Sequence, residues 1–314
     1  MAKVCIVLAT YNGEKYLPQM LDSLLAQTRQ ADFIVAVDDG SKDSSVKILQ
    51  DYAQKLPLQI HALPQNTGHK AAFSKALELA RTQLNDEDLI ALADQDDIWH
   101  PQKIEVLEMK IRDRDLVFGD AQVIDADGKT IANSWREMDR IPKHLSIKAL
   151  LTGFTNVTGC MALFKAGLLA NVLPIPDGVP VHDQWITLCA AVRGGYAPVS
   201  DKVIRYRIHG ENAIGGAGGH SWTEKLRTNL QWAKPVHDST LYARLNEDQK
   251  KFLDGYIAYM DARFQSALLP ARLPWLVRNS HYINPHVHGI FAHLTHAAFG
   301  SVGIKFATRF LGKK

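Results

Sequence analysis

The sequence predicts an α/β fold with a mostly parallel, doubly wound sheet in its N-terminal part and a mainly helical C-terminal region. Three observations predict it. Short apolar runs alternate with segments of helical period, which is the pattern of βαβ units. The apolar runs show no polar alternation, as is typical of parallel strands covered on both faces. Polar residues follow three of these runs directly, where an α/β sheet binds its ligands.

The elements follow one another from the N-terminus. The first strand is expected over residues 3–9, and the turn at residues 10–13 leads into a helix. That helix has Pro18 in its first turn and an apolar face of leucines: Leu17, Leu21, Leu24 and Leu25. A second strand is expected over residues 33–37, followed by a helix that opens at residues 41–45. Strand and helix alternate again at residues 58–63 and in the stripe Phe73, Leu77, Ala80 and Leu84.

Three carboxylates, Asp94, Asp96 and Asp97, follow the apolar run at residues 89–93. Like charges at a strand end repel one another unless a cation or water lies among them. Hard cations such as Mg²⁺ or Mn²⁺ prefer carboxylate oxygen and bridge to substrate phosphates. The run therefore predicts a divalent metal that holds a diphosphate. The alternative is an acidic, solvated loop in which Asp97 caps a helix near Ile98.

These carboxylates are expected to share one rim with other polar residues. Tyr11, Asp38, Asp39, Asp94 and Asp96 follow three different predicted strands. Ligands bind at the carboxyl ends of parallel strands. Polar groups that converge on one rim indicate a binding site more strongly than any one of them does.

Seven motifs occur in order along the chain: VLATYNGEKYL, AVDDGSKDSS, PQNTGHKAAFSKALELA, ALADQDDIWHPQKIE, TGC at residues 158–160, HDQW at residues 182–185 and YRIHGENAIGG at residues 206–216. With them, the chain resembles glycosyltransferase family 2, the inverting nucleotide-sugar transferases with the Rossmann-like GT-A fold. The resemblance covers roughly residues 1–216. Its nearest subgroup builds bacterial surface polysaccharides, often by rhamnosyl transfer. It implies a nucleotide-diphosphate sugar donor, a divalent metal (Mg²⁺ or Mn²⁺) and a hydroxyl of a glycan or lipid-linked acceptor.

The resemblance also implies roles for individual residues. Those implied for the nucleotide sugar are Thr10, Tyr11, Asp38, Asp39, Asn66, Gly68, Lys70, Asp94 and Gln95. Among them, Tyr11 and Asp39 would hold the nucleobase, and Asp94 would engage ribose and diphosphate. Asp96 is implied as the direct metal ligand, and His209 as a contact to the metal or the diphosphate.

The strand that precedes His209 carries two further candidates. Arg205 and Arg207 alternate on one side of it and could face phosphate. The glycines at residues 215–219 that follow predict either a mobile loop over the donor or a simple linker.

Asp183 is the predicted general base, and its neighbour His182 is the rival. The ordinary pKa of histidine, near 6.5, suits neutral pH better than that of aspartate, near 3.9. However, an acceptor hydroxyl need lose its proton only late in an oxocarbenium-like transition state, and a carboxylate also stabilises the developing positive charge. The resemblance implies the aspartate as the base. The alternative for Asp183 is a helix cap before the apolar helix at residues 185–192.

The acceptor side is expected around Gly159, His182 and Trp185. Residues 150–164 are rich in glycine and threonine, and small residues would let an acceptor sugar approach the backbone. The alternative is a buried strand with a bulge at Gly159.

Composition excludes several classes. The 314 residues suggest two domains, predicted at residues 1–216 and 217–314. Three scattered cysteines indicate a reducing compartment rather than a disulfide scaffold. A net charge of +3 is too small to suggest a nucleic-acid partner. We see no secretory leader and no membrane-spanning run, and we expect a cytoplasmic protein.

The region at residues 217–314 reads as mainly helical. Trp222, Leu226 and Leu230 are spaced four apart, and histidines crowd residues 281–296 without the partners of a zinc site. Residues 300–314 pattern as a short helix with Lys305, Arg309 and Lys313 on one face. Such a helix could rest on the inner surface of an anionic membrane, or dock on its own domain or on a second subunit.

Two other classes of protein are alternatives. A nucleotidyltransferase also uses carboxylate-bound Mg²⁺, but it would want a Gly-rich, basic loop after the first strand, and this chain has ATYNGEKY there. A non-catalytic sugar-nucleotide binder would not need both Asp96 and Asp183.

Overall fold

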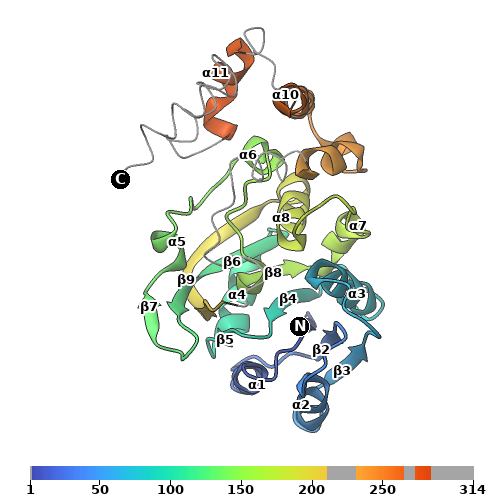
Figure 1. Ribbon diagram of the computed structural model, residues 1–314, viewed down its shortest axis with the longest axis vertical. Helices are drawn as coiled ribbons and strands as arrows, with labels where there is room; N and C mark the ends of the chain where they lie inside the picture. The colour runs from blue at the N-terminus through green and yellow to red at the C-terminus, as the bar shows by residue number, and fades with distance from the viewer. Residues whose placement is uncertain (1, 211–230, 265–272, 284–314) are drawn as a thin grey trace. The chain divides into compact units, whose positions relative to one another are not determined.

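The computed structural model describes residues 2–210, 231–264 and 273–283 (Figure 1). The chain divides into two compact units. The larger comprises Met1–His144, Asn156–Ile175 and Val181–Gly219, and the smaller comprises Leu145–Thr155, Pro176–Pro180 and His220–Lys314. Two short segments from within residues 1–216 thus group with the C-terminal region. The predicted boundary itself, at residues 216–217, lies outside the described residues.

The larger unit is built on a nine-stranded sheet with the order β3-β2-β1-β4-β8-β6-β9-β5, and β7 pairs with β6. Its first half is parallel and consists of β1 (Val4–Thr10), β2 (Phe33–Asp38), β3 (Leu58–Ala62) and β4 (Leu89–Asp94). Thr10 pairs with Asp38, and Ala9 with Asp94, so β1, β2 and β4 end level with one another. This register brings the polar residues that follow each strand to one rim.

Helices cover both faces of these strands, which confirms the predicted α/β fold. On one face Ile6 and Leu8 share a core cluster with residues of α1 (Leu17–Leu25) and α2 (Ser45–Tyr52). Successive strand side chains point to opposite faces, so Cys5 and Val7 face the other side. There α3 (His69–Arg81) packs against β1 and β2 (Figure 1).

The second half of the sheet is mixed. It comprises β5 (Ile98–Trp99), β6 (Leu116–Ile124), β7 (Thr130–Ala132), β8 (Ala162–Lys165) and β9 (Tyr196–Arg207). The short β8 runs antiparallel between β4 and β6, and β9 pairs in parallel with β6 and antiparallel with β5. The helical elements of this half are α4 (Lys103–Ile111), α5 (Trp135–Met138), η2 (Ala166–Leu168), α7 (Leu169–Val172) and α8 (His182–Arg193).

Two local expectations are wrong. Residues 150–164 are not a single strand with a bulge. They contain the end of α6 (Ile147–Leu151), the 3₁₀ turn η1 (Gly159–Met161) and the start of β8. Asp97 does not cap a helix, because the next residue begins β5 and α4 begins only at Lys103.

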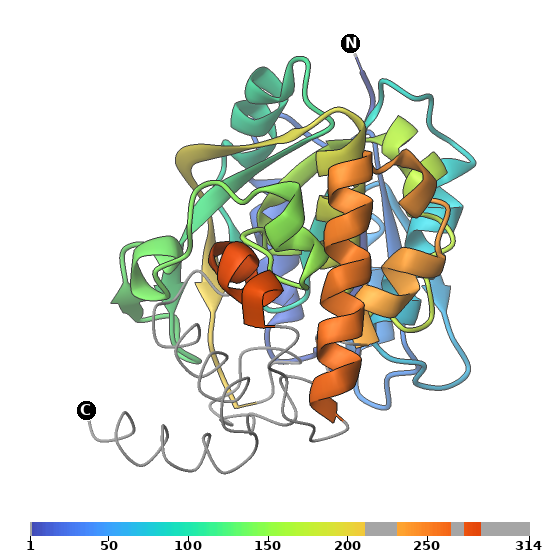
Figure 2. The same cartoon turned by 90° about the horizontal axis from the view of Figure 1, so that it is seen from above.

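The smaller unit is helical where it is described, as predicted for the C-terminal region. It contains α6, the 3₁₀ turn η3 (Tyr242–Arg244), the 18-residue helix α10 (Glu247–Phe264) and α11 (Leu273–Ile283), and Figure 2 shows α10 along its length. Its aromatic side chains bond to the carbonyls that end α6. The indole N–H of Trp232 donates to the Leu150 oxygen (3.0 Å), and the Tyr256 hydroxyl donates to the Thr152 oxygen (3.3 Å). These bonds explain why residues 145–155 belong to this unit.

Several predicted features lie outside the described residues. They are the glycines at residues 215–219, the stripe Trp222, Leu226 and Leu230, most of the histidine-rich segment, and the basic helix at residues 300–314. Within the parts of the chain that the structure describes, no helix is both long enough and apolar enough to cross a membrane.

Candidate active site

The end of β2 is fixed by the first of its two aspartates. The carboxylate of Asp38 is buried and accepts hydrogen bonds from the Thr10 hydroxyl (2.9 Å) and from the Ser41 amide and hydroxyl (2.9 and 2.5 Å). These bonds join the last residue of β1 to the loop after β2. Thr10 and Asp38, both predicted to bind the nucleotide sugar, are buried and bonded to the protein, so they support the rim.

The loop after β1 presents an exposed aromatic ring. Tyr11 is 42% exposed, and both its backbone groups are held by the side chain of Gln95. The Tyr11 amide donates to Gln95 Oε1 (2.8 Å), and Gln95 Nε2 donates to the Tyr11 carbonyl (3.0 Å). A Cβ at Gly13 would overlap the Gln95 amide, which explains a glycine there. The Tyr11 backbone is thus fixed at the rim and its side chain is exposed, which suits stacking on a nucleobase.

The next three amides of this loop are bonded by side chains of the segment that leads into α2. The Asn12 amide donates to the Ser41 hydroxyl (2.9 Å), the Gly13 amide to the Ser45 hydroxyl (2.8 Å), and the Glu14 amide to Asp43 (3.0 Å). The loop therefore offers its tyrosine ring to a ligand, and not a cradle of free amides.

Asp39 connects the rim to the start of α3. One carboxylate oxygen accepts from the Thr67 amide and hydroxyl (both 2.7 Å), and the other accepts from the Gly68 amide (2.8 Å). Gly68 has φ +92° at the N-cap of α3, a conformation that favours glycine. The positive end of the α3 dipole therefore lies beside Asp39. Close to the start of α3, Asn66 is exposed and Lys70 is half-buried.

The three carboxylates at the end of β4 and directly after it, Asp94, Asp96 and Asp97, have different surroundings. Asp97 is fully buried and accepts from the Arg207 amide (3.0 Å). Asp94 is half-buried at the strand end. Burial, followed by the charge of Asp96, raises the pKa of Asp94 to about 7. Negative charge is thus in excess at this point of the rim, as expected where a cation binds.

Asp96 and His209, the two residues predicted to contact a metal, lie together in the structure. His209 Nε2 lies 2.9 Å from Asp96 Oδ2, and the His209 ring packs against that of Tyr16 at 4.9 Å between centroids. The two residues come from loops 113 positions apart in the chain. β9 carries His209 to this place, because it pairs with β5 directly after the acidic run.

The prediction that Arg207 faces phosphate is wrong. Its buried guanidinium donates to the carbonyls of Asp96 (2.8 Å) and Ala126 (3.1 Å) and to Gln19 Oε1 (2.6 Å). Arg205 likewise donates to the Gly128 carbonyl (2.7 Å). Arg207 therefore holds the backbone of the acidic run in place rather than a ligand.

The rim residues fit a hard divalent cation. Asp94, Asp96 and His209 would hold it, since carboxylate oxygens dominate the set and the Asp96–His209 pair already places two donor atoms together. Among the described residues, the three ligand-type side chains that lie within 4.8 Å of one another are Asp94, Asp97 and Cys160. Asp97 and Cys160 of that second group are buried, and nearby Lys103 acts on Asp94 to lower its pKa.

Asp183 lies in the first turn of α8, and it is not the cap, because Val181 occupies that position. Asp183 Oδ2 accepts from the Gly159 amide (3.1 Å), and Oδ1 accepts from the Gln184 amide (2.7 Å). Burial raises the pKa of Asp183 to about 6, against the lowering effect of these two amides. The carboxylate is oriented and has a pKa close to neutrality, which are the properties of a general base.

Two of the three residues predicted on the acceptor side, His182 and Trp185, are buried in the protein. His182 is 6% exposed and stacks on Phe73 at 4.0 Å, and burial lowers its pKa to about 3. Trp185 is 2% exposed, and its indole N–H donates to the Val172 carbonyl (2.9 Å), so an acceptor contact at Trp185 does not hold. Gly159 is buried between α8 and β4, where a Cβ would lie 3.2 Å from both Asp183 Cβ and Leu92 Cδ1.

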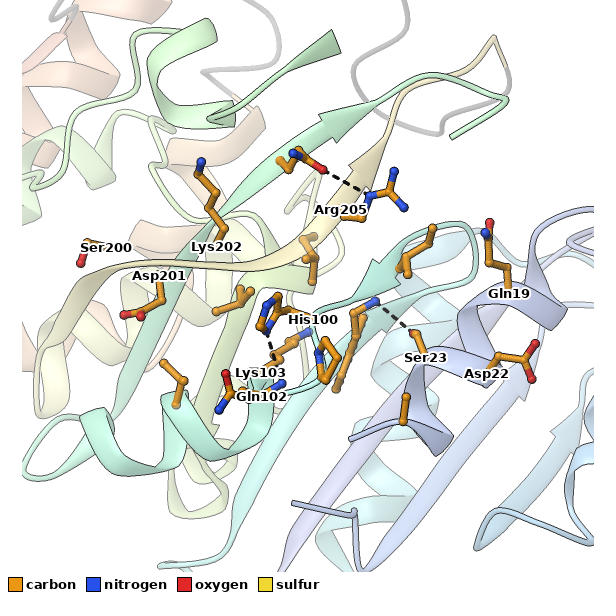
Figure 3. Close-up of a pocket in the computed structure, with 18 residues that line it drawn as sticks. Gln19, Asp22, Ser23, His100, Gln102, Lys103, Ser200, Asp201, Lys202 and Arg205 are labelled. Atoms are coloured by element: carbon orange, nitrogen blue, oxygen red, sulfur yellow. Dashed lines mark hydrogen bonds between the residues drawn. The ribbon is translucent and has the colours of Figure 1, made fainter. Parts of the chain in front are cut away.

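A pocket of about 830 Å³ lies elsewhere in the larger unit, between α1, β5 and β9. Figure 3 shows its lining, with His100 and Gln102 near Lys103 and with Lys202 and Arg205 on β9. The rim carboxylates do not line it. This pocket is therefore separate from the carboxylates, and the candidate active site is the rim that carries them.

Some contributors to the site were not predicted from the sequence. Thr67 donates both its amide and its hydroxyl to the Asp39 carboxylate. A threonine directly before Gly68, at the start of a predicted helix, could have suggested this contact. Ser41 and Ser45 lie in the segment predicted to open a helix, and their hydroxyls accept hydrogen bonds from amides of the loop after β1. Lys103 carried no signal, because a lone lysine at a helix start normally reads as a solvated residue.

A carboxylate-rich rim at the ends of parallel strands, with the oriented carboxylate of Asp183 in the same unit, is typical of the nucleotide-sugar-dependent transferases. The chain belongs to glycosyl transferase family 2, whose model matches residues 5–173, more than half of the 314-residue chain.

Relatives agree with this assignment. An uncharacterized glycosyltransferase of Nostoc sp. is 29% identical over 220 residues, which are 67% of this chain and 66% of that protein. Uncharacterized glycosyltransferases of Rickettsia felis and Rickettsia conorii are 24% identical, over 41% and 38% of their lengths. The chain thus spans less than two thirds of each of these relatives.

Solved structures share the GT-A fold. Staphylococcus aureus TarS in complex with UDP-GlcNAc matches with a TM-score of 0.62 at 17% identity, over 99% of this chain and 92% of that one. The mannosyltransferase PcManGT from Pyrobaculum calidifontis, in complex with GDP-Man and Mn²⁺, matches with a TM-score of 0.53 at 16% identity, over 99% and 88%. Together with the family match, they confirm the predicted fold class.

Proposed function

We propose that this protein is an inverting, metal-dependent glycosyltransferase. It transfers a hexosyl or rhamnosyl unit from a nucleotide-diphosphate sugar to a hydroxyl of a glycan or lipid-linked acceptor in bacterial cell-surface polysaccharide synthesis. The observation that carries the proposal is the Asp96–His209 pair together with the oriented carboxylate of Asp183, whose charge acts on Asp94 of the same acidic run. Family membership supports the reaction class.

The donor side binds and orients. Tyr11 supplies a flat face for the nucleobase, and Asp39 with the start of α3 borders the nucleotide. A divalent cation at Asp94, Asp96 and His209 would neutralise the charge of the leaving diphosphate. Complexes of two proteins of the same fold, one with UDP-GlcNAc and one with GDP-Man and Mn²⁺, favour such a donor and such a cation.

Asp183 removes the acceptor proton. As the acceptor oxygen forms its bond to the anomeric carbon, the bond from that carbon to the diphosphate oxygen breaks, and the nucleoside diphosphate leaves. The proton of the acceptor hydroxyl passes to Asp183. A single displacement of this kind inverts the anomeric centre. The pKa of about 6 keeps Asp183 ionised at neutral pH while making it a stronger base than an ordinary aspartate.

The loop after β1 argues against a nucleotidyltransferase. Such an enzyme needs free backbone amides after the first strand to cradle phosphates. Here the amides of Tyr11, Asn12, Gly13 and Glu14 all donate to side chains of the protein.

The test is a thermal-shift screen of nucleotide sugars, with and without Mn²⁺, on the wild type and on Asp96→Ala. A donor at one hundred times its dissociation constant adds about 2.7 kcal/mol to the free energy of unfolding. We expect one nucleotide sugar to raise the Tm of the wild type only with Mn²⁺, and not that of Asp96→Ala.

Donors that bind are then assayed for release of nucleoside diphosphate and for transfer. Binding without hydrolysis or transfer to any glycan or lipid-linked acceptor would indicate a non-catalytic sugar-nucleotide binder. If no nucleotide sugar stabilises the wild type, the proposal is wrong.

A further inference from the structure

Lys103 is a buried lysine at the start of α4, and burial lowers the pKa of its amine to about 7. Its side chain is 1% exposed, and Nζ donates to the carbonyl of Cys160 (2.6 Å). The ammonium also lies 3.1 Å from the centroid of the Trp99 ring. Lys103 and Trp99 both line the pocket shown in Figure 3. A buried ammonium is costly unless it is bonded, so this position is well defined by its partners.

The carbonyl that Lys103 holds belongs to the turn that holds the base. Cys160 is the middle residue of η1, and the preceding Gly159 donates its amide to Asp183 Oδ2 (3.1 Å). A Cβ at Gly159 would lie 3.2 Å from Asp183 Cβ, so the turn and the start of α8 are in close contact. Two hydrogen bonds in series therefore connect the ammonium to the carboxylate.

Lys103 also faces the carboxylates beneath the metal side of the rim. Asp94, Asp97 and the Cys160 thiol have ligand-type atoms within 4.8 Å of one another, and the charges of Asp97 and Asp94 act on Lys103. The lysine thus lies between the acidic run and the turn of the base. The Gly159 amide is the bond through which a change in the turn would reach Asp183.

We propose that Lys103 is a positioning residue for the base: by holding the Cys160 carbonyl, it fixes the turn at residues 159–161 so that the Gly159 amide orients Asp183. This inference rests on the proposed function, in which Asp183 takes the proton. Lys103 itself touches no substrate.

The role has a signature that a merely structural lysine lacks. The Gly159 amide lowers the pKa of Asp183. Loss of the Lys103 bond lets the turn shift and weakens that amide bond, and the pKa of Asp183 then rises. The other titratable groups facing Asp183 are Asp94 on β4 and its neighbour His182.

The first experiment measures the pKa of Asp183 directly, by ¹³C NMR titration of its carboxyl group, and needs no activity. We expect a pKa near 6 in the wild type, a higher value in Lys103→Met, and a near wild-type value in Lys103→Arg, which keeps a donor. Lys110→Met, at an exposed lysine of the same helix, is the matched control and should change nothing. If Lys103→Met does not fold, Lys103→Gln replaces it with the same expectation.

The second experiment is a double-mutant cycle on kcat at saturating donor and metal. Misplacing a catalytic group by about 1 Å costs roughly 10²-fold in rate, so we expect a loss of that order in Lys103→Met, with donor Kd little changed. In an Asp183→Asn background the same substitution should cost almost nothing more, because the group that it positions is gone.

Two outcomes would overturn the inference. One is an unchanged pKa of Asp183 in a folded Lys103→Met or Lys103→Gln. The other is a full multiplication of the two losses in the double mutant, which would mean that Lys103 acts through the metal-side carboxylates instead. A wild-type protein that transfers no sugar would refute the proposed function but would leave the NMR test of the positioning role intact.

Discussion

The donor side and the base side of the site are built differently. On the donor side, the strands β1, β2 and β4 end level, and the polar residues just after them bond to one another across neighbouring strands. On the base side, Asp183 stands on α8, its amide partner Gly159 is in a 3₁₀ turn, and the lysine that holds this turn begins α4. One side follows from sheet register, and the other from the packing of segments that are distant in the chain.

The difference indicates what each side can tolerate. A residue at a strand end has its place set by the ladder, so its substitution removes a ligand contact with little change elsewhere. The base has no ladder behind it and depends on single hydrogen bonds. We therefore expect donor-side changes to appear in donor and metal affinity, and base-side changes to appear in turnover.

The largest effect is expected at the metal. Asp96→Ala should abolish transfer and the Mn²⁺-dependent part of donor binding, because it removes the carboxylate that meets His209 at 2.9 Å. Calorimetry of donor binding with and without Mn²⁺ measures the second effect, and circular dichroism checks that the fold persists. Full activity of Asp96→Ala, or of the wild type in EDTA, would contradict the metal assignment.

The next effect tests the base. Asp183→Asn keeps the size and removes the charge, and it should lower kcat by about 10²–10⁴-fold with donor Kd little changed. His182→Ala should lower kcat much less, because His182 is buried against Phe73 and points inward. Steady-state kinetics with a saturating donor compare the two. The reverse result would make the histidine the base.

The pH profile tests the base independently. Asp183 must be ionised to accept a proton, so kcat should fall as the pH drops below about 6 and level off above it. An unperturbed aspartate would place this limb near pH 4. The folded state binds the Asp183 proton more tightly than the unfolded state does, so this group favours unfolding as the pH rises through 6. Asp183→Asn should therefore have a higher Tm than the wild type at pH 8, which thermal scans can show.

A smaller effect is expected at the exposed end of the donor side. Tyr11→Ala removes the ring but not the backbone bonds to Gln95. Loss of one base-stacking ring typically costs about 1–3 kcal/mol of binding, so donor Kd should rise while kcat stays near that of the wild type. Tyr11→Phe is the control and should bind normally. A fall in kcat with an unchanged Kd would break the division between the two sides.

The smallest effect concerns neither side. If residues 300–314 rest on a membrane, neutralising Lys305, Arg309 and Lys313 should weaken binding to anionic vesicles, and salt should weaken that of the wild type. Vesicle sedimentation measures it, with neutral vesicles as the control. If the wild type ignores anionic vesicles, a docking or oligomer role is favoured, and analytical ultracentrifugation tests for a second subunit.

The donor side was largely predictable. Apolar runs without alternation imply parallel strands, and parallel strands bring the residues that follow them to one rim. Asp38 shows the limit of this reasoning. It lies on the rim as expected, yet Thr10 and Ser41 occupy both its oxygens, because hydrogen-bond partners are set by loop conformation.

The place of Asp183 at a helix start was predictable, but the surroundings of its carboxylate were not. The sequence pattern marks Asp183 at a helix start, but no local pattern shows that His182 is buried or that Trp185 packs in the core. The carbonyls of Leu150 and Thr152 accept hydrogen bonds from Trp232 and Tyr256, which lie 82 and 104 positions away in the chain. Such partners are chosen by packing, which periodicity does not encode.

By itself, the sequence determined the periodicity of the elements, the succession of the rim strands along the chain and the carboxylates at their ends. These features depend only on neighbours along the chain. Only the tertiary structure decided which polar groups face a ligand and which are bonded inside. The sequence suggested phosphate contact for Arg207 and gave no role to Lys103, yet both are buried and donate to backbone carbonyls. A charge in a sequence has no environment, and its desolvation and its partners exist only once distant segments have packed around it.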